Sequence, residues 1–172
     1  MKKLLLGAAV VVSAAAFGQR VQKGDVQLNA GIAADRYANS VAFYAGLDYG
    51  IHPDITIGAE ARFGGDDGRR DGVNYDARWF GFGVNGNYHF NNLLDIPNKY
   101  DVYAGITVGH NSFNYKYDNG WNNGWADPHD AGVGVSAQVG ARYYFTDNFG
   151  LNAEANAGSL FNGGKFGISY KF

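Results

Sequence analysis

The chain of 172 residues contains no cysteine, which excludes disulfide bonds and thiolate metal ligands. Its four histidines, His52, His89, His110 and His129, lie in separate segments and lack the spacing of a metal site. A formal net charge of −2 provides no basic surface of the kind that nucleic-acid-binding proteins use. We therefore expect no metal, no other cofactor and no nucleic-acid partner.

Long apolar runs are missing everywhere except near the N-terminus. There, two lysines precede residues 4–17, an apolar segment that is too short for a membrane-spanning helix and leads into small residues. This pattern predicts a secretory signal peptide over residues 1–18, and the absence of cysteine excludes lipoprotein processing. Residues 19–172 then form one domain, which cannot be a bundle of membrane helices because it has no further apolar run.

Glycine and aromatic residues are abundant, and the sequence has a period of two. It holds 26 glycines, only three prolines and 16% aromatic residues, which favours closely packed strands. Eight segments alternate apolar and polar residues, and no segment of helical periodicity interrupts them. They are residues 24–33, 41–49, 54–63, 78–90, 100–110, 132–145, 148–158 and 165–172.

The two faces of these segments differ in chemistry. One face is apolar, whereas the other carries glycine, asparagine, serine and most of the charged residues. Ten residues of a tilted strand rise about 25 Å, the height of the lipid-facing band of an outer-membrane barrel. A soluble barrel with the apolar face inside would expose few charges, which is poor for solubility. The pattern therefore predicts an all-β fold, an eight-stranded antiparallel up-and-down transmembrane β-barrel with its polar face inward.

The charged residues of the polar face should form a network inside this barrel. Eight strands enclose a space that side chains fill, and buried charges must pair there. The predicted network consists of Asp48, Glu60, Arg62, Asp101, Arg142, Glu154 and Lys171. Glu60, Arg62, Arg142 and Glu154 are expected near mid-height and paired, and the other three nearer the periplasmic end.

The links between segments predict the orientation of the barrel. Tight turns follow the second and sixth segments, whereas residues 64–77 and 112–131 are Gly-rich, polar and predicted to be long loops. Short turns face the periplasm and long loops face outward in outer-membrane barrels. Both termini are therefore predicted to be periplasmic.

The second long loop is the candidate surface-contact loop. Aromatic side chains among polar neighbours suit contact with an external glycan or protein ligand. The alternative is that the same residues rest on the outer leaflet, since Trp and Tyr favour the membrane–water interface. The residues concerned are Tyr115, Tyr117, Trp121 and Trp125.

Three short motifs carry a resemblance to a known family. They are residues 18–19 at the predicted cleavage site, the turn 93–97 with the strand 100–105, and the C-terminal 167–172, which ends on an aromatic residue. In these motifs the chain resembles the small outer-membrane β-barrel family of Gram-negative bacteria, the OmpA/OmpX type, and especially barrels of the Bacteroidetes. The resemblance implies contact with outer-membrane lipids and lipopolysaccharide. It also implies insertion by the barrel-assembly machinery, and Phe172 is similar to the signal that this machinery reads.

Three functions stay open for such a barrel. A filled interior favours a non-conducting barrel with a structural or surface-interaction role, in adhesion or host contact, and with no catalytic residue. A narrow pore for small ions or solutes is the first alternative. The second is a lipid A-modifying enzyme, because His110 and Ser112 resemble the His-x-Ser pair of outer-membrane lipid A deacylases. The nearest acid that could orient this histidine is Asp118, in the predicted loop.

Overall fold

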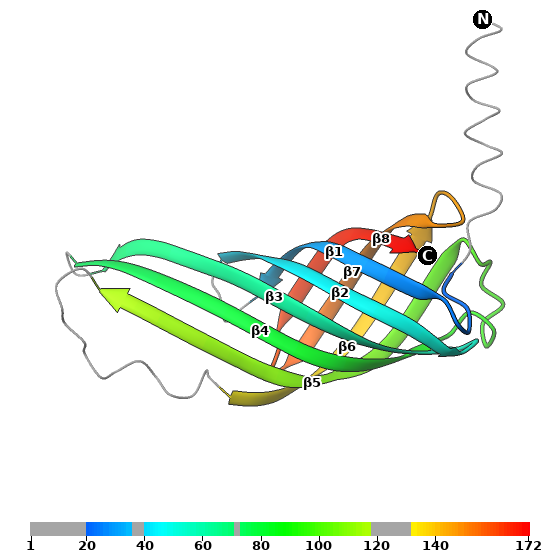
Figure 1. The fold of residues 1–172 in the computed structure, drawn as a ribbon, viewed down its shortest axis with the longest axis horizontal. Helices are drawn as coiled ribbons and strands as arrows, with labels where there is room; N and C mark the ends of the chain where they lie inside the picture. The colour runs from blue at the N-terminus through cyan, green and yellow to red at the C-terminus, as the bar shows by residue number, and fades with distance from the viewer. Residues whose placement is uncertain (1–19, 36–39, 71–72, 118–131) are drawn as a thin grey trace, which may run out of the picture.

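The computed structural model describes residues 20–35, 40–70, 73–117 and 132–172, which form one closed antiparallel β-barrel (Figure 1). The strands follow one another around the barrel in chain order, which confirms the predicted architecture. They are β1 (Val26–Asp35), β2 (Ser40–His52), β3 (Ile55–Arg70), β4 (Val73–His89), β5 (Tyr100–Tyr117), β6 (Gly132–Tyr144), β7 (Phe149–Gly158) and β8 (Gly163–Lys171). Within the described residues, no helix has the length and apolar character needed to cross a membrane.

The barrel closes where its last strand pairs with its first. β8 runs antiparallel to β1, with Lys171 opposite Gln27 and Gly163 opposite Asp35. The Phe172 backbone N–H continues this pairing by donating to the Val26 carbonyl over 2.9 Å. Every strand therefore has two neighbours, an arrangement that satisfies the backbone polar groups without water.

The two ends of the barrel differ in their links. At one end, which we call the terminal end, lie Arg20, Phe172 and the links β2–β3, β4–β5 and β6–β7 (Figure 1). The opposite end, the far end, carries the other four links.

At the far end, the predicted loops are shorter than expected because the strands continue through them. The prediction of a loop over 64–77 is wrong, since β3 and β4 stay paired until Arg70 stands opposite Val73. β5 likewise continues to Tyr117 instead of ending at residue 110. Backbone pairing does not need an apolar outer face where strands leave the membrane, so the alternation fades before the strands do. As a result β3, β4 and β5 project beyond the rest of the far end (Figure 1).

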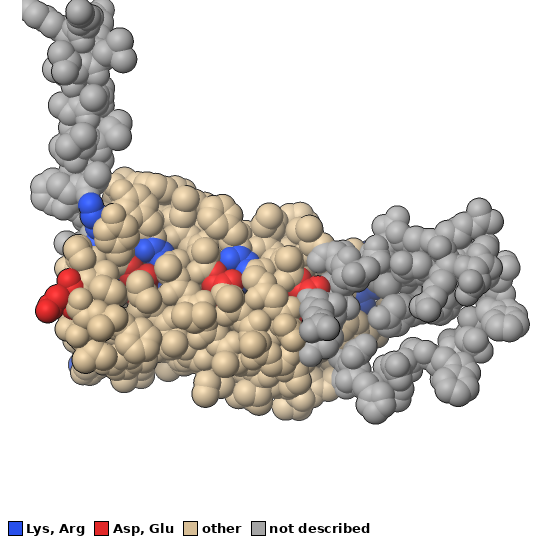
Figure 2. All heavy atoms as spheres, turned by 180° about the vertical axis from the view of Figure 1, so that it is seen from behind, with Lys and Arg blue, Asp and Glu red and all other residues tan. Residues whose placement is uncertain are grey.

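Side chains alternate strictly between the interior and the outer surface. In β6, Gln138 and Arg142 are buried while Val135 and Val139 are exposed. The exposed side chains include many large apolar ones, for example Phe63, which is 59% exposed. Figure 2 shows one side of the barrel as almost wholly free of charge, with Lys, Arg, Asp and Glu atoms confined to a narrow row along it and to the ends. This inside-out distribution suits a barrel that is surrounded by lipid.

Aromatic rings meet one another on the outer surface at the terminal end. The ring centroids of Tyr100 and Tyr143 lie 5.2 Å apart, and those of Tyr143 and Phe145 also lie 5.2 Å apart. On the strand that closes the barrel, Tyr170 and Phe172 are 5.0 Å apart. Such a belt is typical of the membrane–water interface.

A charge placed in the apolar outer band should destabilise the barrel in lipid. Val84 of β4 is 61% exposed and lies opposite Ala59 and Val108 on neighbouring strands. We expect Val84→Arg to lower the free energy of unfolding in phospholipid vesicles by about 2–4 kcal/mol. Urea titration of the refolded protein measures this loss, with Val84→Leu as the control. Equal stabilities of the two variants would contradict a lipid-facing position.

Candidate functional site: the charged barrel interior

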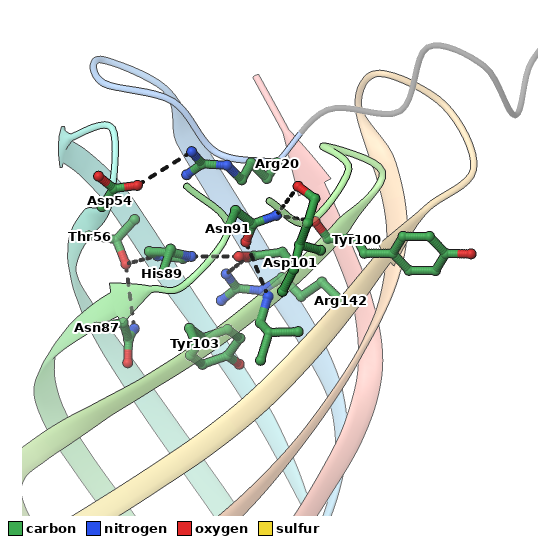
Figure 3. Close-up of polar contacts among 12 residues, drawn as sticks. Arg20, Asp54, Thr56, Asn87, His89, Asn91, Tyr100, Asp101, Tyr103 and Arg142 are labelled. Atoms are coloured by element: carbon green, nitrogen blue, oxygen red, sulfur yellow. Dashed lines mark hydrogen bonds and ion pairs between the residues drawn. The ribbon is translucent and has the colours of Figure 1, made fainter. Parts of the chain in front are cut away.

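One group of interior charges, the terminal cluster, is centred on Arg142 (Figure 3). Its guanidinium donates from Nη2 to Asp48 Oδ2 over 2.7 Å and from Nη1 to Asp101 Oδ2 over 3.0 Å. The other carboxylate oxygen of Asp101 accepts a hydrogen bond from His89 Nδ1 over 2.7 Å. His89 Nε2 lies 3.0 Å from the Thr56 hydroxyl. These five buried side chains come from β2, β3, β4, β5 and β6, so the cluster ties most of the barrel wall together.

A second group, the far cluster, lies closer to the far end and contains two cations and three carboxylates. Arg62 Nε donates to Glu60 Oε1 over 2.7 Å, and Arg62 Nη1 lies 3.6 Å from Asp35 Oδ2. Lys165 Nζ lies 2.9 Å from Glu154 Oε1 and also pairs with Glu60. At least nine-tenths of each of these side chains is buried, so the five charges depend on one another as partners.

Tyr103 of β5 connects the two clusters. Its ring lies 4.3 Å from the Cζ atom of Arg142, and its hydroxyl donates to Glu154 Oε2 over 2.7 Å. A cavity of about 10 Å³ remains between the clusters, lined by residues of both. This volume is about that of one water-sized probe, so side chains fill this part of the interior almost completely.

Amide and hydroxyl side chains occupy the space around the charges. Asn29 donates to Asp48 over 2.9 Å, and Asn152 donates to Ser169 over 3.0 Å. Gln138 of β6 donates to Asn87 of β4, inside the intervening strand β5. Most of the buried polar groups therefore have partners, as a low-dielectric interior requires.

The structure places all seven residues of the predicted network inside the barrel, but in a different arrangement. Arg142 pairs with Asp48 and Asp101 instead of with the other residues expected at mid-height, because Asp101 stands directly opposite it on β5. Glu154 stands opposite Lys165 on β8 and pairs with it. Lys171 lies at the terminal end, 3.4 Å from Asp25.

Three titratable members of the clusters are absent from the predicted network. Lys165 and His89 lie on the inward face by the period of two, so the sequence pattern contained the signal for both. Asp35 was assigned to a link, whereas β1 extends to it and keeps it on the inward face. The period of two predicts which way a side chain points, but it does not predict the residue at which a strand ends.

At the far end, an apolar loop covers the far cluster. In the link between β7 and β8, residues 159–162, Leu160 and Phe161 fold into the barrel and are at most 1% exposed. The Phe161 ring lies 3.8 Å from the Cζ atom of Arg62 and meets the Trp79 ring edge-on at 6.2 Å. We call this segment the inward loop. Nothing in its sequence distinguishes it from an exposed apolar turn.

The N-terminal segment covers the terminal end. Arg20 is 2% exposed, and its guanidinium contacts the Pro53 carbonyl, Asn92 Oδ1 at 3.0 Å and Asp54 Oδ1 at 3.5 Å (Figure 3). Its backbone N–H donates to the Asn98 carbonyl over 2.8 Å. Arg20 thus holds the β2–β3 turn and the β4–β5 link together over the barrel mouth.

The remaining predicted sites lie on the surface or beyond the described residues. His110 and Ser112 are exposed on β5, where the His110 ring meets the Phe82 ring edge-on at 6.4 Å. Trp121 and Trp125, the side chains of Tyr115 and Tyr117, and the predicted signal peptide lie outside the described part. Across the side chains that are described, no three His, Asp or Glu residues gather as metal ligands would.

A closed eight-stranded barrel with a charged interior and an apolar outer band defines a transmembrane β-barrel. The family model of the outer membrane protein beta-barrel domain matches residues 4–172, and the chain belongs to this family. The predicted resemblance is thereby confirmed, and the family places the chain in the bacterial outer membrane.

Solved structures share the fold at low sequence identity. The outer membrane protein OprG from Pseudomonas aeruginosa is 11% identical, with a TM-score of 0.63 over 90% of this chain and 99% of that one. The N-terminal β-barrel domain of Pseudomonas aeruginosa OprF is 14% identical, with a TM-score of 0.54 over 87% and 98%. Ail, the attachment invasion locus protein of Yersinia pestis, is 10% identical, with a TM-score of 0.52 over 88% and 100%. No curated protein sequence matches this chain.

Removal of the central cation should strongly destabilise the barrel. Arg142→Met leaves Asp48 and Asp101 buried without their common partner, and we expect a loss of about 3–5 kcal/mol in the free energy of unfolding. Urea titration of the protein refolded in vesicles measures the loss. The triple variant Arg142→Met, Asp48→Asn, Asp101→Asn should regain part of it, because no unpaired charge remains. A triple variant less stable than Arg142→Met would argue against charge burial as the cause.

Proposed function

We propose that this protein is a non-conducting outer-membrane barrel with a structural or surface-interaction role. The observation that carries the proposal is the filled interior. Two clusters of ion pairs, joined by Tyr103, leave a cavity of only about 10 Å³ between them. A hydrated ion needs a continuous water path, and the described side chains leave little room for one.

A narrow pore is the competing function, and single-channel recording separates the two. We expect no current steps from the wild-type protein or from Glu60→Gln in planar lipid bilayers. Glu60 binds both Arg62 and Lys165, so its neutralisation loosens the far cluster without removing a bulky side chain. Reproducible wild-type steps whose size or ion selectivity changes in Glu60→Gln would support a pore. An unrelated porin provides the positive control for insertion.

For the orientation, we propose that the terminal end faces the periplasm and the far end the outside. The longest link, residues 118–131 between β5 and β6, belongs to the far end, from which β3, β4 and β5 also project. Short turns are periplasmic in barrels of this type. Outer-membrane lipids and lipopolysaccharide then surround the apolar band, and the barrel-assembly machinery is the proposed partner during insertion, with Phe172 in the strand that closes the barrel.

The proposed contact surface is the far end with the loop that follows β5. β5 projects beyond the rest of the far end and leads into this loop, and the proposed contact residues are Tyr115, Tyr117, Trp121 and Trp125. Ail of Yersinia pestis was solved in complex with the heparin analogue sucrose octasulfate, and its fold is similar to that of this chain. That complex makes an external glycan a reasonable first probe here.

Deletion of residues 119–127 tests the surface role. We expect the deletion to reduce binding to a panel of sulfated and neutral glycans, or to cultured host cells, while the barrel remains folded. Leu93→Ser with Leu94→Ser is the control, since both side chains are exposed at the terminal end. Equal binding by wild type, deletion and control would indicate instead that the aromatic residues rest on the outer leaflet.

We propose no catalytic role for His110 and Ser112. A triad needs an acid that orients the histidine. Within the described part of the chain, the His110 ring has no hydrogen bond or ion pair, and its neighbour is the apolar ring of Phe82. Asp118, the candidate acid of the sequence, lies outside the described residues, so this proposal rests on the contact of His110 with the Phe82 ring.

A further inference from the structure

Glycine residues of the neighbouring strands leave the space that the inward loop occupies. A Cβ atom on Gly134 of β6 would lie 2.8 Å from the Leu160 backbone nitrogen, and one on Gly83 of β4 would lie 3.0 Å from Leu160 Cδ2. A Cβ atom on Gly81 would lie 2.9 Å from Phe161 Cε1. At Gly81 and Gly83 the nearest atoms belong to Asn111 and Thr107, whereas at Gly134 all three nearest atoms belong to Leu160, so a methyl group at Gly134 would press directly on the loop.

Polar groups of the wall satisfy the backbone of the loop inside the barrel. Asn111 Nδ2 donates to the Leu160 carbonyl over 2.6 Å. The Ser136 hydroxyl donates to the Phe161 carbonyl over 2.9 Å and accepts from the Phe161 N–H over 2.7 Å. A buried loop normally costs unsatisfied backbone groups, and here fixed partners remove much of that cost.

The loop separates the far cluster from the far end. Leu160 and Phe161 form a buried apolar cluster with Tyr44, Trp79 and nearby alanines, and Phe113 packs against it. Directly beneath the cluster lies the Arg62 guanidinium, in contact with the Phe161 ring. An apolar layer over buried ion pairs excludes water and strengthens their attraction.

We propose that the inward loop is a built-in plug that seals the far end of the barrel. Ion-paired side chains of the strands fill the interior, but at the far end the side chains of Leu160 and Phe161 form the barrier to water. The inference rests on the proposed closed interior and adds that the first barrier from outside is a displaceable loop. Displacement would expose the layer of Arg62 to external water while the terminal cluster stays in place.

A single cysteine beneath the plug tests the seal, because the chain has no cysteine of its own. Thr107 is 2% exposed, lies opposite Ser136 and is close in size to cysteine. In the Thr107→Cys background, we expect a membrane-impermeant maleimide to react at least about tenfold faster when Leu160→Gly and Phe161→Gly remove the plug. The protein is held in detergent micelles, and the denatured protein gives the value for full labelling.

A second variant displaces the plug without changing its side chains. Gly134→Ala places a methyl group against Leu160 and should also accelerate labelling, whereas Gly86→Ala, whose Cβ would meet nothing within 4 Å, should not. Leu93→Gly with Leu94→Gly matches the double glycine substitution at an exposed link. Circular dichroism identifies any variant that does not fold. If the double glycine variant does not fold, the labelling rate of Gly134→Ala tests the plug in its place.

The outcomes distinguish this inference from the proposed function. Equal labelling rates in the folded wild-type, Gly134→Ala and double-glycine backgrounds overturn the plug, whether the rates are slow or fast. Accelerated labelling without single-channel current supports both the plug and the filled interior. Accelerated labelling with current in the plug variants supports the plug but overturns the closure of the interior by ion pairs.

Discussion

A wall of eight strands encloses a space that only side chains can fill, and each charge inside it must find its partner there. The strand register decides which partners meet. Asp101 stands opposite Arg142, and Glu154 stands opposite Lys165, so two cross-strand pairs anchor the two clusters. The core of the barrel is mostly polar, unlike that of a soluble protein, because its apolar side chains face lipid. Its internal cohesion therefore depends on hydrogen bonds and ion pairs.

The chain closes both mouths of this polar core with its own segments, in two different ways. Arg20 closes the terminal end with polar contacts to two links. Leu160 and Phe161 close the far end with an apolar layer over Arg62. The two closures give the interior a low dielectric from both sides, which makes each ion pair stronger and each unpaired charge more costly.

The sequence predicts much of this architecture, since a period of two reports directly which way a side chain points. It identified the eight strands, the inward face and charged residues such as Glu60 and Arg142. It did not predict that β3 and β4 pair through 64–77, because strands outside the lipid need no apolar face. It also missed the inward loop, since the burial of Phe161 depends on glycines of β4 and β6 that are distant in sequence. Pairing partners require the register, which alternation alone does not contain.

The pairing of β1 with β8 also has a consequence for the order of folding events. These strands lie at opposite ends of the chain, yet Gln27 and Lys171 are direct neighbours in the sheet. Contacts between residues so far apart in sequence form slowly, because a long loop must close first. Until β8 pairs with β1, each of these two strands has one unpaired edge and the barrel stays open. Unpaired strand edges promote aggregation, so the pairing of β8 with β1 also protects the folded sheet from association through its edges.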